Sequence, residues 1–114
     1  MIYNFNSVIY DLDDKPMNQS DDGQIETLTF GKVARGALVS LDDDEMKLSG
    51  EKKNSRFILT CDIKRAEKGD GKLDIGTDEA SWIKAAIEKK YRNLVVIGRC
   101  QDILKNEGEK PIKE

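Results

Sequence analysis

The acidic side chains are the residues best suited to chemistry, and they gather at residues 11–14, 42–45 and 78–79. Carboxylates held in a cleft can exchange protons with a substrate or bind a metal ion. A calcium loop that starts at Asp11 would need an oxygen ligand and a glycine at positions that hold a lysine and a proline. Residues 42–45 fit a solvated linker, and residues 78–79 fit the first turn of a helix. We therefore expect no catalytic residue, no metal and no cofactor. A small carboxylate-based hydrolase or metal enzyme is the weakest alternative.

The chain of 114 residues has no histidine. This excludes Ser-His and Cys-His nucleophile pairs, zinc held by histidine and an imidazole proton shuttle. Cys61 and Cys100 lie within apolar helical patterns and are too few for a cysteine-only zinc site, so we expect buried free thiols. The glycines match neither the dinucleotide-binding nor the P-loop motif.

Basic residues cluster on one predicted helix, where Lys52, Lys53 and Arg56 lie close together and are candidates for partner binding. Together with Lys64 and Arg65 they are also a candidate nucleic-acid face. The formal net charge of -3 and the absence of interleaved aromatic residues make nucleic acid the alternative partner and another protein the expected one.

Trp82 lies beside the apolar stripe formed by Ile83, Ala86 and Ile87. One interpretation is an aromatic residue at the edge of the core. The other is an anchor that faces a partner, because tryptophan is enriched in the hot spots of interfaces. Both interpretations stay open at this point.

Residues 1–28 are predicted to be extended. Tyr3 and Phe5 alternate with polar residues, which is a strand signal, and a turn follows at residues 13–16. Residues 18–23 are expected to form a loop. The edges of such strands can pair with another chain, so Tyr3 and Phe5 are further candidates for partner binding.

Four helices are predicted after this segment. Thr29, Ser49, Thr77 and Asn93 are the expected N-caps, and Gly69 should end the second helix. The predicted core consists of residues on the apolar faces of these helices: Phe30, Val33, Leu38, Phe57, Ile58, Cys61, Ile83, Ile87, Tyr91, Val96, Cys100 and Leu104.

The turn at residues 11–16, the helix starts at 27–31 and 48–52, and the stretch at 78–104 together resemble a group of small proteins from tailed bacteriophages and prophages. The chain departs from that group at Asp14, where a turn glycine is common. The shared motifs are caps, turns and core positions, which specify a fold better than a function. The resemblance implies a phage origin and a non-enzymatic accessory role.

These observations predict one α+β domain, mainly α, over residues 1–106. An N-terminal β-hairpin or extended arm (1–28) would pack on about four short helices (29–106), and residues 107–114 would be a charged tail. The expected function is protein–protein binding, in virion assembly or in the inhibition or redirection of a host protein. No apolar run is long enough for a membrane span, and no secretory signal is expected, so the expected location is the cytoplasm of the host bacterium. The sequence leaves the oligomeric state open.

Overall fold

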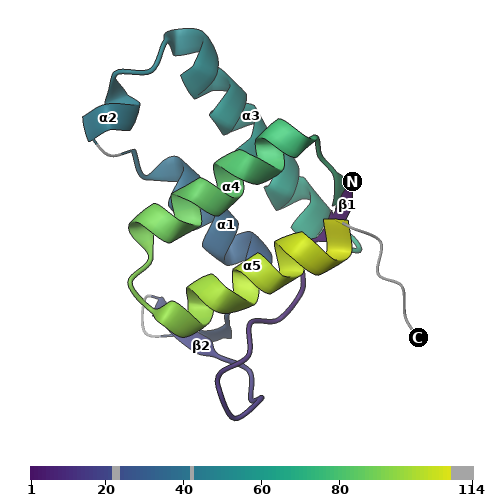
Figure 1. Cartoon of the computed structure of the whole chain (residues 1–114). Coiled ribbons are helices and arrows are strands. Elements are labelled where there is room, and N and C mark those ends of the chain that lie inside the picture. The colour runs from purple at the N-terminus through teal and green to yellow at the C-terminus, as the bar shows by residue number, and fades with distance from the viewer. Residues whose placement is uncertain (22–23, 42, 109–114) are drawn as a thin grey trace.

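The computed structural model describes residues 1–21, 24–41 and 43–108, and helices predominate in them (Figure 1). The fold is α+β and mainly helical, as predicted. The strands form two antiparallel sheets: β1 (Ile2–Asn4) pairs with β4 (Lys72–Asp74), and β2 (Asn18–Asp21) pairs with β3 (Gln24–Thr27). The helices of the described residues are α1 (Phe30–Val39), α2 (Asp43–Met46), α3 (Gly50–Glu67), α4 (Thr77–Lys90) and α5 (Leu94–Gly108).

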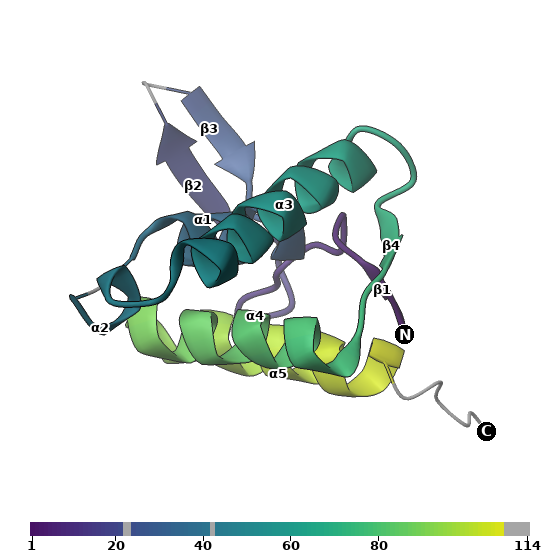
Figure 2. The same cartoon turned by 90° about the horizontal axis from the view of Figure 1, so that it is seen from above.

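Helix α1 lies at the centre of the molecule and packs against both α3 and α4 (Figure 2). Its apolar face is buried along its length, through Phe30, Val33, Ala37 and Leu38 among others. The predicted cap is confirmed, because the Thr29 hydroxyl accepts a hydrogen bond from the Lys32 amide at 3.3 Å. Helix α1 therefore holds the α3 side and the α4–α5 side of the protein together.

The N-terminal arm is part of the core. Strand β1 pairs with β4 so that Tyr3 lies opposite Leu73, and β1 also packs against α5. Tyr3 is 2% exposed and Phe5 is fully buried, with its ring stacked on Phe30 at a centroid distance of 4.9 Å. The prediction that Tyr3 and Phe5 bind a partner is therefore wrong, because the protein's own core covers both side chains.

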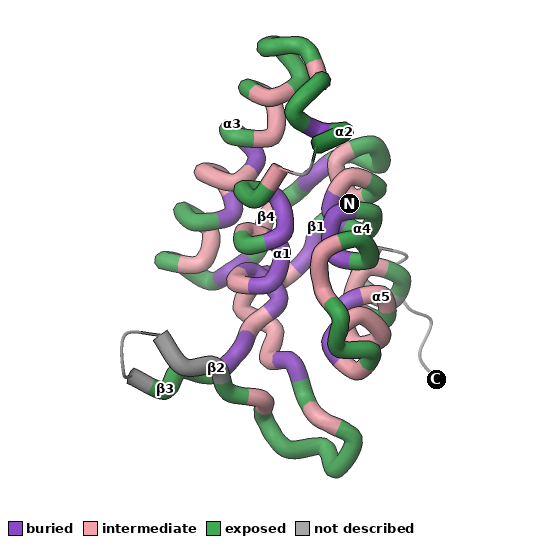
Figure 3. Tube along the Cα trace, turned by 90° about the vertical axis from the view of Figure 1, so that its left-hand side faces the viewer, coloured by how far each residue is buried: buried purple, intermediate pink, exposed green. Residues whose placement is uncertain are grey.

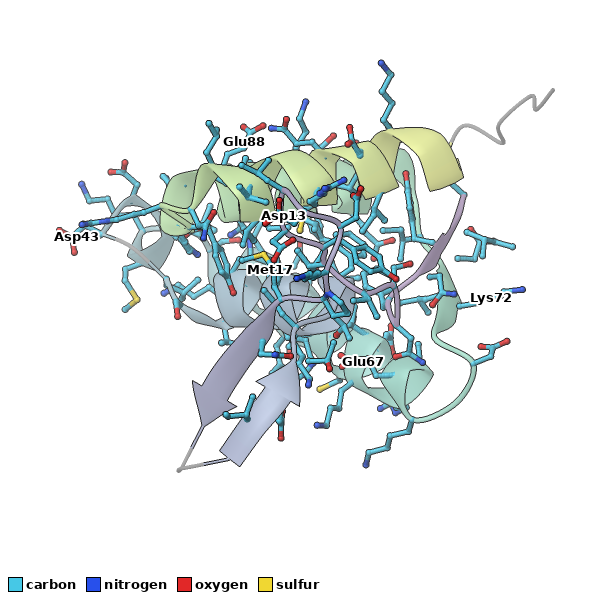
Figure 4. All side chains as sticks on the ribbon, turned by 90° about the horizontal axis from the view of Figure 1, so that it is seen from below. Asp13, Met17, Asp43, Glu67, Lys72 and Glu88 are labelled. Carbon is cyan, nitrogen blue, oxygen red and sulfur yellow. The ribbon has the colours of Figure 1, made fainter. Side chains whose placement is uncertain are left out.

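Residues 8–17 form a turn beside α5 rather than a regular strand, and Figure 4 labels Asp13 there. Asp14 has a φ of 60°, the left-handed conformation in which glycine is favoured and aspartate is tolerated. Residues 18–21 were predicted to be a loop but belong to strand β2, and residues 22–23 of that predicted loop lie outside the described residues.

Helices α4 and α5 run antiparallel and form a hairpin (Figure 1). Asn93 caps α5 by accepting hydrogen bonds from the amides of Val95 and Val96. The N-cap of α4 is Gly76 rather than Thr77. The Glu79 carboxylate accepts a hydrogen bond from the Gly76 amide at 2.9 Å. Helix α5 continues to Gly108, so the predicted tail does not start at residue 107, and residues 109–114 lie outside the described part.

Most of the predicted core is confirmed, but Phe57 and Ile58 are 64% and 51% exposed. Both lie in the first half of α3, which extends beyond the core together with α2 (Figure 3). Helix α3 turns Leu59 and Ile63 inward, whereas Phe57 and Ile58 lie on its other sides and stay exposed. Three of the other predicted core residues are half-buried: Cys61, Tyr91 and Leu104.

Candidate functional site

The candidate site is a groove between α3 and α4, two helices that both pack against α1. The part near the start of α4 is a hollow of about 500 Å³, lined by Ser55 and Ile58 of α3, by residues 76–79 and by Trp82. Trp82 also lines a second hollow of about 340 Å³ toward the end of α4, together with Ala85 and residues of α2 and α3. Trp82 is therefore the residue that the two halves of the groove share. We call this surface the α3–α4 groove.

Two large apolar side chains are available in the α3–α4 groove. Ile58 is 51% exposed, and Trp82 is half-buried because part of its ring packs against the core. Met46 of α2 and Phe57 are exposed as well, at 55% and 64%, but neither of them lines a hollow of the groove. Apolar side chains gathered near one concave surface are typical of a protein-binding site.

A buried ion cluster closes the end of the groove near α2. The Glu45 carboxylate pairs with the Arg56 guanidinium and, at 2.8 Å, with the Lys90 ammonium. Lys90 also donates a hydrogen bond to the Ala37 carbonyl at 2.6 Å. Glu45 is 8% exposed, so its prediction as a solvated linker residue is wrong. The cluster ties α2, α3, α4 and the end of α1 together.

Arg56 belongs to this ion cluster, whereas the other two residues of the predicted basic patch do not. Arg56 lines the α3–α4 groove but has its charge compensated by Glu45. Lys52 is exposed and Lys53 is half-buried, and neither of them lines a hollow of the groove. Trp82 is thus the candidate residue that the structure places directly in the groove, with Arg56 at its end as a structural residue.

The groove residue that the sequence analysis missed is Ile58, which was assigned to the core. A usable signal was present, because Phe57, Ile58, Leu59 and Ile63 spread around more of the helix than one packing face can cover. At least one of these residues had to be exposed or covered by a partner.

Both cysteines are free thiols, with Cys61 half-buried and Cys100 buried. Burial raises the pKa of the Cys100 thiol to about 12, which keeps it protonated and unreactive near neutral pH. In the part of the chain that the structure covers, no three carboxylate or thiol side chains are grouped so that they could hold a metal ion. None of the helices described has both the length and the apolar character needed to span a bilayer.

No protein-family model, curated protein or solved structure matches this chain. The geometry of the α3–α4 groove and the chemistry of its lining are therefore the observations on which a function can be built.

Proposed function

We propose that this protein is a non-enzymatic binding protein whose α3–α4 groove holds an amphipathic helix of another protein. The observation that supports this most is the pairing of Ile58 with Trp82 across one hollow, with half of the Ile58 side chain exposed. Burying such side chains on association contributes about 25 cal/mol for each Å² of apolar surface removed from water, which offsets the entropic cost of association. A groove between two helices is a common receptor for the apolar face of a third.

Charge complementarity gives the proposed partner its further chemistry. Asp78 is exposed at the end of the groove near the start of α4, where the described lining contains no cation, whereas Glu88 at the other end is exposed beside Lys89. The Glu45 carboxylate is already compensated by two cations. We therefore expect a helix with one large apolar anchor for the space beside Trp82 and a basic residue on the side of that anchor that faces Asp78.

The resemblance to phage and prophage proteins is the support for a more specific role. On that basis we propose that the partner is a phage structural protein or a host protein, met in the cytoplasm of the host bacterium. The nucleic-acid alternative has less support, because Arg56 and Arg65 are each paired with a carboxylate, Glu45 and Asp62 respectively.

The test is affinity capture from a lysate of the bacterium that encodes or hosts the chain. It compares the unaltered protein with Ile58→Asp, which places a charge in the groove, and with Leu94→Asp. Leu94 is 79% exposed and lies outside the groove, so its variant is a matched control for the loss of an exposed apolar side chain. We expect one protein that the unaltered chain and Leu94→Asp recover equally and that Ile58→Asp loses.

Equal recovery by both variants, or recovery of no protein by any of them, would contradict the proposal. Size-exclusion chromatography with light scattering tests a different occupant. A dimer that Ile58→Asp dissociates and Leu94→Asp does not would assign the groove to a second copy of this chain, and the heterologous partner would be wrong.

A further inference from the structure

A second cleft lies on the other side of α3 from Ile58. It has a volume of about 740 Å³. It is bounded by α1, α3, Glu26 of strand β3, and Tyr91. Its volume falls within the range of small-molecule sites, about 300–1,000 Å³. Charged and hydroxyl-bearing side chains make up most of its lining, in contrast to the apolar lining of most such sites. A polar, charged ligand suits it better than an apolar one.

The cleft has an excess of two positive charges, although the whole chain has a formal net charge of -3. Its carboxylates are both in ion pairs: Glu26 with Lys32 at 3.0 Å, and Glu67 with Arg35 through two contacts of 2.5 and 3.0 Å. The two other cations are Lys64 of α3 and Lys68, the C-cap of that helix, and the structure gives them no carboxylate partner among the described residues.

Lys64 lies in the last turn of α3 and Lys68 is its C-cap, whose backbone is still right-handed helical, so the two lysines lie about one turn apart on the same side. Both are exposed and both line the cleft. Two ammonium groups at this spacing repel each other when the cleft contains only water. An anion between them removes that repulsion, and a doubly charged anion compensates both charges.

The wall beside these lysines is fixed in place. The Glu67 side chain lies against Gly31, where a Cβ atom would be 2.6 Å from the carboxyl carbon, so a larger residue at position 31 would displace it. Figure 4 labels Glu67 at the end of α3. Held in this way, Glu67 fixes the Arg35 fork at the wall of the cleft.

Tyr91 supplies a neutral donor at the wall of the cleft. Gly36 leaves room for its hydroxyl, since a Cβ at that position would be 3.3 Å from the phenol oxygen. Burial is the main cause that raises the pKa of Tyr91, so its O–H stays protonated near neutral pH and can donate to an anion.

We propose that this cleft binds the phosphate group of a small molecule, with Lys64 and Lys68 as its charge partners and the Tyr91 hydroxyl as a further donor. Phosphate monoesters are largely dianionic near neutral pH and accept several hydrogen bonds, which matches two lysines one turn apart in a cleft that the Tyr91 hydroxyl also lines. The site is on the opposite side of α3 from the α3–α4 groove and shares no lining residue with it. The phosphate proposal can therefore be tested independently of the proposed protein partner.

The test is isothermal titration calorimetry of the full chain with inorganic pyrophosphate at low salt. The double variant Lys64→Gln/Lys68→Gln should weaken binding by at least about tenfold, because it removes both charge-assisted contacts. The double variant Lys47→Gln/Lys52→Gln makes the same charge change at exposed positions outside the cleft and should bind like the unaltered protein. Added salt should weaken the binding of the unaltered chain.

A second variant, which should strengthen rather than weaken pyrophosphate binding, adds a further test. Glu67→Gln keeps the shape of the side chain but removes its charge, so the Arg35 guanidinium becomes available and pyrophosphate should bind more tightly. Loss of binding in the Lys47→Gln/Lys52→Gln control, no binding to the unaltered chain, or weaker binding to Glu67→Gln with an unchanged melting temperature would overturn the proposal. A single-stranded oligonucleotide that binds more tightly than pyrophosphate and is lost in Lys64→Gln/Lys68→Gln would also overturn it, in favour of nucleic acid.

Discussion

The N-terminal arm and the first half of α3 have similar side chains and opposite roles. Each contains an aromatic ring close to a branched apolar residue, yet Phe5 is fully buried and Phe57 is 64% exposed. The arm is covered because β1 pairs with β4 and packs against α5, and because Phe5 stacks on Phe30. The first half of α3 has no such layer over its outer sides. The difference teaches that composition marks the apolar segments, while neighbours distant in sequence decide which of them are buried.

Truncating the buried ring should have the largest effect on stability. Phe5→Ala removes a stacked, fully buried side chain, and we expect it to lower the free energy of unfolding by about 3–5 kcal/mol. Phe57→Ala is the matched change in the exposed region and should alter it by no more than about 0.5 kcal/mol. Urea denaturation followed by circular dichroism measures both. Similar losses for the two variants would show that the contrast between the regions is wrong.

Disrupting the ion cluster should have the second-largest effect on stability. Glu45→Ala leaves the Arg56 and Lys90 charges uncompensated in a mostly buried position, which should cost about 2–3 kcal/mol of unfolding free energy. Asp44→Ala is the control, since Asp44 is exposed in the same turn and should matter by no more than about 0.5 kcal/mol. The same denaturation experiment compares them. If the two carboxylates proved equivalent, α2 would not be held over the groove by Glu45.

The two cysteines extend the contrast between the regions from stability to thiol reactivity. Iodoacetamide at pH 8 should label Cys61, which is half-buried on α3, well before Cys100, which is fully buried on α5. Peptide mass spectrometry gives the two labelling rates. Faster labelling of Cys100 would mean that the core on the α5 side opens more readily than α3 does.

The pH dependence of Cys100 has a defined sign. Burial raises the pKa of its thiol from 9.0 to about 12, so the folded protein disfavours the thiolate relative to the unfolded chain. Its contribution to stability is complete below pH 9 and is lost as the pH rises toward about 12. Replacing Cys100 by alanine should therefore make the stability less dependent on pH in this alkaline window, as thermal melts at a series of pH values would measure.

The helices could be predicted largely because their signals are local. Thr29, Ser49 and Asn93 each accept a hydrogen bond from an amide two or three residues later, which a reader of the sequence can expect. Strand β4 could not be predicted in this way. It has three residues and no alternating pattern of useful length, and its partner β1 lies about 70 residues away in the chain.

The candidate site was predicted only in part, for a related reason. Trp82 stood out by its type and by its place beside an apolar stripe, and it lines the groove. Ile58 was assigned to the core because helical periodicity alone does not tell which of two apolar faces a neighbour will cover. Glu45 was assigned to solvent because its partners, Arg56 and Lys90, come from two later helices.

Oxidative footprinting by hydroxyl radicals, read residue by residue by mass spectrometry, tests the central claim most directly. It is applied to the free chain and to the complex with the captured partner. We expect Ile58 and Trp82 to react in the free chain and to be protected in the complex, with Tyr3 and Phe5 unreactive in both. Strong reaction of Tyr3 and Phe5 in the free chain, followed by their protection in the complex while Ile58 and Trp82 do not change, would contradict the account.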